Sequence, residues 1–111
     1  MAGFSLHISP TELAARLSEP DAPRLLDVRE VEEHALVALP NSKLIPLGEL
    51  AVRASELEGW RDNELVVYCH HGIRSLHAIA MLRQLGFRKL RNLSGGIDRW
   101  SEEVDPALPR Y

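Results

Sequence analysis

One short segment of the sequence gathers most of the side chains that can do chemistry. The segment Cys69–Ser75 contains the only cysteine of the chain, two histidines, a glycine and an arginine. A β-branched, mostly apolar run, Glu64–Tyr68, precedes it, and a helical pattern begins at its last residue. A cysteine between a buried strand and a helix N-terminus faces backbone N–H groups, which stabilise a thiolate or bind an anion. The segment therefore predicts a nucleophilic cysteine in an anion-binding loop.

Two interpretations of Cys69 compete. A free cysteine is most often small apolar filler in a core, and Cys69 taken alone fits that description. The residues after it favour a nucleophile, because a filler cysteine does not require a loop of this composition. Gly72 permits a tight backbone curl, and Arg74 can either clamp an oxyanion or brace the loop. His70 and His71 either orient a donor and lend positive charge or are simply exposed loop residues.

The elements that position this loop alternate between strands and helices. Short apolar runs predict strands at Arg24–Val28, Lys43–Pro46, Glu64–Tyr68 and Lys89–Leu93. Apolar residues at helical spacing predict helices from Pro10 to Leu17, from Leu47 to Leu57, from Ser75 to Leu85 and from Gly96 to Trp100. Ser9 is the expected N-cap of the first helix, where Glu12 can close a capping box. Gly86 is the expected C′ residue after the third helix.

This order of elements favours an α/β fold. The strands are continuously apolar, which is typical of a parallel sheet covered by helices on both faces. We therefore expect a central, mostly parallel sheet of about five strands with helices on both sides. Ligands of open parallel sheets bind at the carboxyl ends of the strands, which is where Cys69 falls.

Length and composition restrict the class of protein further. The 111 residues suit one domain, 1–111, and the single cysteine excludes an internal disulfide and a cysteine zinc cage. No apolar stretch approaches the roughly 18 residues of a membrane span. The net charge of −3 gives no reason to expect nucleic acid. The first five residues show no secretory signal, so the expected location is the cytoplasm.

Charge is distributed unevenly along the chain. Between Leu65 and Ser101 there are six basic residues and one acid, Asp98, whereas the remainder carries an excess of acids. Such an asymmetry either reflects solvated helix faces or produces a field that draws anions to the loop. The sequence leaves both interpretations open.

Several motifs, in the right order, resemble the rhodanese family of sulfurtransferases. Leu25–Arg29, followed by Glu32 or Glu33 and by His34, resembles the family segment L-D-V-R-x-x-x-E-[YH]. Further matches are the I-P-L stretch at Ile45–Leu47, the strand and active-site loop at Val66–Ser75, and the closing signature at Leu85–Phe87 and Leu93–Trp100. The chain departs from the family at Val37-Ala38, where Gly-His is frequent, and at Pro40–Ser42, where Pro-Gly-Ala is frequent.

The resemblance implies a single rhodanese-like domain that works through a persulfide on Cys69. The expected donor is a small anion such as thiosulfate, and the expected acceptor is cyanide, a small thiol or a protein thiol. The implied binding loop consists of His70, His71, Gly72, Ile73, Arg74 and Ser75. Asp27 and Arg29 are expected to form a structural ion pair near the site. No cofactor, metal, nucleic acid or membrane is implied.

Loop length and the closing residues bear on the alternatives. The related phosphatases have five residues between cysteine and arginine, whereas four separate Cys69 from Arg74, which disfavours phosphatase activity. An interaction or sensing module without turnover stays an alternative, as does a dedicated persulfide relay to a protein or sulfur carrier. Residues 103–111 resemble the ends of rhodanese domains fused to sulfur-carrier-activating enzymes, although stand-alone domains have related tails. Because no second cysteine exists, the sulfur has to leave to an external acceptor.

Overall fold

A five-stranded sheet forms the centre of the computed structural model, which describes residues 5–111. Every neighbouring pair of strands is parallel, and the order is β1-β5-β4-β2-β3. The strands are β1 (His7–Ile8), β2 (Arg24–Asp27), β3 (Lys43–Leu44), β4 (Leu65–Tyr68) and β5 (Leu90–Leu93). The predicted α/β fold is confirmed. The expectation that no secretory signal is present concerns the first five residues, of which 1–4 lie outside the described residues.

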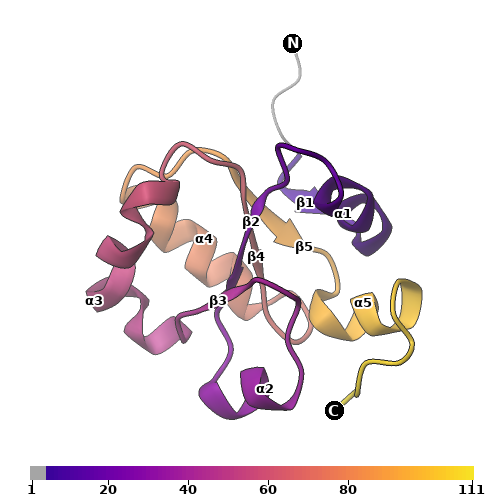
Figure 1. Ribbon diagram of the computed structural model, residues 1–111. Helices are drawn as coiled ribbons and strands as arrows, with labels where there is room; N and C mark the ends of the chain where they lie inside the picture. The colour runs from indigo at the N-terminus through magenta and orange to yellow at the C-terminus, as the bar shows by residue number, and fades with distance from the viewer. Residues whose placement is uncertain (1–4) are drawn as a thin grey trace.

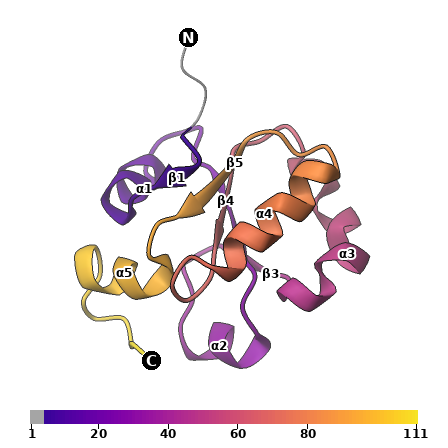
Figure 2. The same cartoon turned by 180° about the vertical axis from the view of Figure 1, so that it is seen from behind.

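Helices cover both faces of this sheet, as Figures 1 and 2 show from opposite sides. One face carries α1 and α5, and the other carries α3 and α4, while α2 lies beyond the sheet beside the end of the chain. The helices are α1 (Pro10–Leu17), α2 (Val31–Leu36), α3 (Leu50–Arg53), α4 (Arg74–Gln84) and α5 (Gly96–Glu103). No helix in residues 5–111 is long and apolar enough to cross a membrane.

The central strand β4 is buried on both faces. Val66 and Tyr68 belong to the core under α1 and α5, whereas Leu65, Val67 and Cys69 belong to the core under α3 and α4. Burial of both faces explains the continuous apolar run that the sequence shows here. A strand anchored on both sides also provides a rigid base for the loop that follows it.

The prediction of one continuous helix at 47–57 is wrong. One turn of α-helix, α3, is flanked by 3₁₀ segments at Leu47–Glu49 and Ala54–Trp60. Leu47 and Leu50 pack against the core, as do Leu57 and Trp60. The leucines at 47, 50 and 57 therefore reach the core as the sequence pattern predicts, although the backbone that carries them is divided between 3₁₀ and α conformations.

The helix-end predictions are confirmed in part. Ser9 caps α1 by accepting a hydrogen bond from the N–H of Glu12 at 3.1 Å. The carboxylate of Glu12 does not close the expected capping box; it lies 3.4 Å from Nη2 of Arg91. Gly86 follows α4 with a φ of +95°, as expected of a C′ glycine. Two short elements, β1 and α2, are absent from the sequence-based prediction.

The segment Pro40–Ser42, which departs from the family pattern, contains a residue in the left-handed backbone conformation. Asn41 has a φ of +62° at the position where the family pattern has glycine. Asparagine is among the non-glycine residues that adopt this conformation most readily. The hydroxyl of Tyr68 accepts a hydrogen bond from the N–H of Leu39 at 3.1 Å and lies 2.8 Å from Oγ of Ser42. These contacts attach the segment to the central strand.

Candidate active site

Cys69 lies at the carboxyl end of β4, with its side chain only 1% exposed. The backbone N–H of Gly72 donates to Sγ at 3.1 Å, and that of Ser75 donates at 3.4 Å. Helix α4 begins at Arg74, so its N-terminus lies directly beside the sulfur. Two N–H groups and the positive end of a helix dipole therefore converge on one atom. Such an arrangement stabilises a thiolate or a persulfide anion.

Asn92 of β5 forms hydrogen bonds to two residues of the loop. Its carboxamide oxygen accepts a hydrogen bond from the hydroxyl of Ser75, and its nitrogen donates to the carbonyl of Gly72 at 3.4 Å. Asn92 is 2% exposed. Sequence reasoning missed this residue. The available signal was a polar residue inside an expected buried strand, because buried polar groups require hydrogen-bond partners.

The N-terminus of α5 holds the opposite side of the loop. The N–H of Ile97 donates to the carbonyl of Cys69 at 2.9 Å, and the N–H of Asp98 donates to that of His70 at 3.1 Å. Gly96 permits this approach, since a Cβ there would lie 2.3 Å from the carbonyl oxygen of His70. Gly72 adopts a φ of +97° at the turn of the loop. The carbonyl groups of Cys69 and His70 are thus bound by α5, while the N–H groups of Gly72 and Ser75 face the sulfur.

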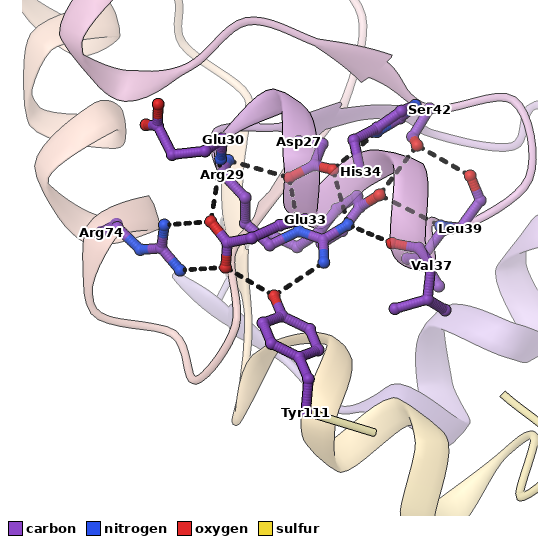
Figure 3. A network of polar contacts seen from close by, with 11 residues as sticks. Asp27, Arg29, Glu30, Glu33, His34, Val37, Leu39, Ser42, Arg74 and Tyr111 are labelled. Carbon is purple, nitrogen blue, oxygen red and sulfur yellow. Dashed lines mark hydrogen bonds and ion pairs between the residues drawn. The ribbon is translucent and has the colours of Figure 1, made fainter. Parts of the chain in front are cut away.

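Arg74 is bound by a carboxylate from α2. Glu33 accepts hydrogen bonds from both arms of the Arg74 guanidinium, at 2.7 and 2.9 Å (Figure 3). The Arg74 hydrogen bonds lower the pKa of Glu33 from 4.5 to about 2. The family resemblance left open whether Glu32 or Glu33 is the glutamate of the motif. The structure shows that Glu33 is the one that contacts the loop. The geometry is that of a loop brace.

Tyr111 joins three parts of the site. Its hydroxyl donates to Glu33 at 2.7 Å and accepts from Nη1 of Arg29 at 2.8 Å (Figure 3). Burial raises the pKa of Tyr111 to about 12, so the phenol keeps its proton at neutral pH. Its ring stacks on His70, with centroids 3.8 Å apart and planes inclined by 6°. Nothing in the sequence pattern singled out this tyrosine or connected it with the loop.

Asp27 and Arg29 form a buried ion pair beneath this network. Nε of Arg29 lies 2.9 Å from one Asp27 oxygen and Nη2 lies 2.8 Å from the other, with both side chains fully buried. Arg29 also donates to the carbonyl of Val37 at 2.6 Å, and Nδ1 of His34 lies 2.8 Å from Asp27. The guanidinium is therefore occupied within the protein and offers nothing to a ligand.

The two loop histidines have different environments. His70 lies between Tyr111 and His71, burial lowers its pKa, and its Nε2 is buried without a hydrogen-bond partner among residues 5–111. The side chain of His71 is 62% exposed, and its Nε2 lies 3.8 Å from the Asp98 carboxylate. Both oxygens of that carboxylate already accept hydrogen bonds from Arg110, at 3.0 and 3.1 Å. The next loop residue, Ile73, is exposed.

The excess of basic residues between 65 and 101 does not gather at the loop. Three of them, Arg83, Arg88 and Lys89, lie near the end of α4 and before β5, at the opposite edge of the sheet. Arg91 is bound to Glu64 and Glu12, and Arg99 to Glu103. Only Arg74 belongs to the loop, and Glu33 neutralises it. The charge asymmetry therefore reflects solvated and paired side chains.

Together the fold and loop define a parallel α/β domain that holds its single cysteine in an anion-binding loop at the end of the central strand. The sequence pattern of the rhodanese-like domain matches residues 9–103. The chain belongs to the rhodanese-like sulfurtransferase family.

Named relatives agree with this membership. The chain is 34% identical over 101 residues to a sulfurtransferase from Allochromatium vinosum, covering 91% of this chain and 92% of that protein. It is 35% identical over 96 residues to the adenylyltransferase and sulfurtransferase uba4 of Ogataea parapolymorpha, covering 86% of this chain. The chain spans 24% of the length of uba4, and 36% of the rhodanese-like/PpiC domain-containing protein 12 of Arabidopsis thaliana.

Solved structures show the same fold. The human single-domain sulfurtransferase TSTD1 matches with a TM-score of 0.78 and 30% identity, covering 90% of this chain and 98% of that one. A rhodanese-related protein from Thermoplasma volcanium matches with a TM-score of 0.80 and 36% identity, covering 90% and 94%.

The low pKa of Glu33 predicts a pH dependence of stability. The folded-state pKa of about 2 lies below the ordinary value of 4.5, so the charged carboxylate stabilises the fold fully above pH 4.5. This contribution is lost as the pH falls toward 2. Urea unfolding should show wild type to be more stable than Glu33→Gln at pH 7, with a difference that narrows between pH 4.5 and 2. A difference that stays constant down to pH 2 would contradict the assignment.

Proposed function

We propose that the protein transfers sulfane sulfur from a small donor to a thiophilic acceptor through a persulfide on Cys69. The thiolate attacks the outer sulfur of a donor such as thiosulfate. A bond forms between Sγ and that sulfur, the S–S bond of the donor breaks, and sulfite leaves with the electron pair. An acceptor such as cyanide then attacks the outer sulfur, and the Cys69 thiolate leaves as thiocyanate is formed. The two half-reactions predict ping-pong kinetics.

One observation carries this proposal: two backbone N–H groups converge on Sγ at the N-terminus of α4. Both the thiolate and the persulfide are anions, so the same donors support the reacting group before and after sulfur uptake. In this proposal the backbone N–H groups of Gly72 and Ser75 stabilise the negative charge on the sulfur, and Arg74 braces the loop. The remaining loop residues lie at its outer side: His70, His71 and Ile73. Asp27 and Arg29 support the site structurally. We also propose that the reaction takes place in the cytoplasm, where a single thiol stays reduced.

Mass spectrometry of the intact protein tests the proposal. Incubation with thiosulfate should add one sulfur, and peptide mapping should locate it on Cys69. Subsequent addition of cyanide should remove the sulfur and release an equal amount of thiocyanate. If neither thiosulfate nor any other sulfane donor adds sulfur, the chain is instead a rhodanese-like interaction or sensing module.

A dedicated persulfide relay is a second candidate for the same chemistry. The sole cysteine is compatible with it, because no internal thiol can resolve the persulfide and a protein thiol is one external acceptor that could take the sulfur. The relatives include the putative sulfur carrier protein YrkF of Bacillus subtilis, which is 33% identical over 98 residues and is matched over 52% of its length. Rates of sulfur release to cyanide and to a protein thiol, compared at equal concentration, separate the two candidates. A faster release to the protein thiol supports the relay.

A further inference from the structure

The positive charges around the loop are all compensated within the described part of the chain. Arg74 interacts electrostatically with Cys69, yet both of its arms are held by Glu33. Arg29 is held by Asp27 in the same way, and Arg110 by Asp98. The sulfur site therefore relies on N–H groups and a helix dipole, with no uncompensated guanidinium among these residues.

This pairing affects donors according to their charge. Thiosulfate carries two negative charges, whereas methanethiosulfonate offers the same outer sulfur with a single negative charge. An uncompensated cation near the thiolate attracts the dianion more strongly than the monoanion, because the Coulomb energy scales with charge. A cation neutralised by a carboxylate gives little such preference.

We propose that Glu33 is a specificity-determining residue of the sulfur-transfer site, because by occupying both arms of Arg74 it withholds the loop cation from dianionic donors. The inference rests on the proposed function and adds which donors that site accepts. With the pair neutralised, the site does not favour a dianion such as thiosulfate over donors of lower charge, such as thiosulfonates and the persulfides of small thiols. The part of Glu33 is to position and neutralise Arg74, and it does not contact the reacting atoms.

Glutamine is the substitution that isolates this effect. Oε1 of Glu33 also accepts a hydrogen bond from the N–H of Glu30 at 2.9 Å, and together these two residues form the capping box of α2. A glutamine amide oxygen fulfils the same capping role. Tyr111 donates to the other oxygen, Oε2, and the amide nitrogen of glutamine takes that place, so this hydrogen bond is not kept. Glu33→Gln therefore removes the charge and keeps the capping acceptor of α2, and the lost contact with Tyr111 affects both donors alike.

The matched control is the neighbouring glutamate. Glu32 is exposed, lies in the same helix, and makes no ion pair with Arg74. Glu32→Gln thus removes an equal charge one residue away without releasing the loop cation. A general change in surface charge alters both variants alike, whereas the proposed effect belongs to Glu33 alone.

The measurement is kcat/KM for thiosulfate divided by kcat/KM for methanethiosulfonate, with cyanide as the acceptor. We expect this ratio to rise about tenfold in Glu33→Gln, an effect consistent with one additional unit of donor charge near an uncompensated guanidinium. The ratio in Glu32→Gln should stay within about twofold of wild type, because an exposed charge is screened. Changes in folding or in cysteine reactivity affect both donors and cancel in the ratio.

The double variant Glu33→Gln/Arg74→Gln supplies a second test, since it leaves neither charge uncompensated. Its ratio should return to the wild-type value. A ratio unchanged in Glu33→Gln, or a large fall in the double variant, overturns the proposal, because Arg74 would then already serve the donor in wild type. If neither donor places sulfur on Cys69 in wild type, the proposed function itself fails.

Discussion

Replacement of Cys69 by alanine should abolish sulfur uptake and lower the rate of sulfur transfer by at least about 10³-fold, because the attacking atom is removed. Sγ is also the acceptor for the N–H groups of Gly72 and Ser75. We therefore expect a loss of stability of about 1 kcal/mol as well, from two donors left without their acceptor. Mass spectrometry after incubation with thiosulfate and the rate of thiocyanate formation are the two measurements.

Cys69→Ser is the control that separates chemistry from structure. A serine hydroxyl offers an acceptor to the same two N–H groups but is a much weaker nucleophile at neutral pH. This variant should be as inactive as Cys69→Ala and closer to wild type in thermal unfolding. Sulfur uptake by either variant would show that another group accepts the sulfur, and the role given to Cys69 would be wrong.

Gly96→Ala is the substitution with the largest expected effect on stability. A Cβ at this position would lie 2.3 Å from the carbonyl oxygen of His70 and 2.5 Å from that of Cys69. Both neighbours are backbone atoms, and the φ of +64° is itself unfavourable for alanine. The start of α5 has to move away from the loop, so we expect a loss of about 3 kcal/mol in the free energy of unfolding.

The same movement should impair sulfur transfer. Displacement of α5 releases the carbonyls of Cys69 and His70, which Ile97 and Asp98 hold in the native loop. Gly48→Ala is the matched control, since nothing lies within 4 Å of a Cβ there. Urea unfolding and thiocyanate formation are measured for both variants. Equal stability of the two variants would show that the loop does not depend on close contact with α5.

Local sequence signals located the parts of the site that are continuous in the chain. The strand before Cys69, the curl at Gly72 and the helix after it are neighbours in sequence, and their residue types favour these conformations directly. By contrast, α2 has only six residues and buries none of them, so no apolar periodicity reveals it. That helix nevertheless carries Glu33, the carboxylate that binds Arg74. The most consequential charge near the loop thus lay in an element that hydrophobic patterning does not detect.

The sequence by itself determined an α/β fold and a single cysteine in an anion-binding loop at a strand end. These conclusions depend on periodicity and on residue types within short stretches of sequence. Such local conformational preferences do not require contacts between distant segments. The tertiary structure alone decided what surrounds that loop. Glu33 lies 41 residues from Arg74, Asn92 lies 17 from Ser75, and Tyr111 lies 78 from Glu33. Such contacts arise because the strand order brings α2, β5 and the last residues to one edge of the sheet, and no local pattern specifies that order.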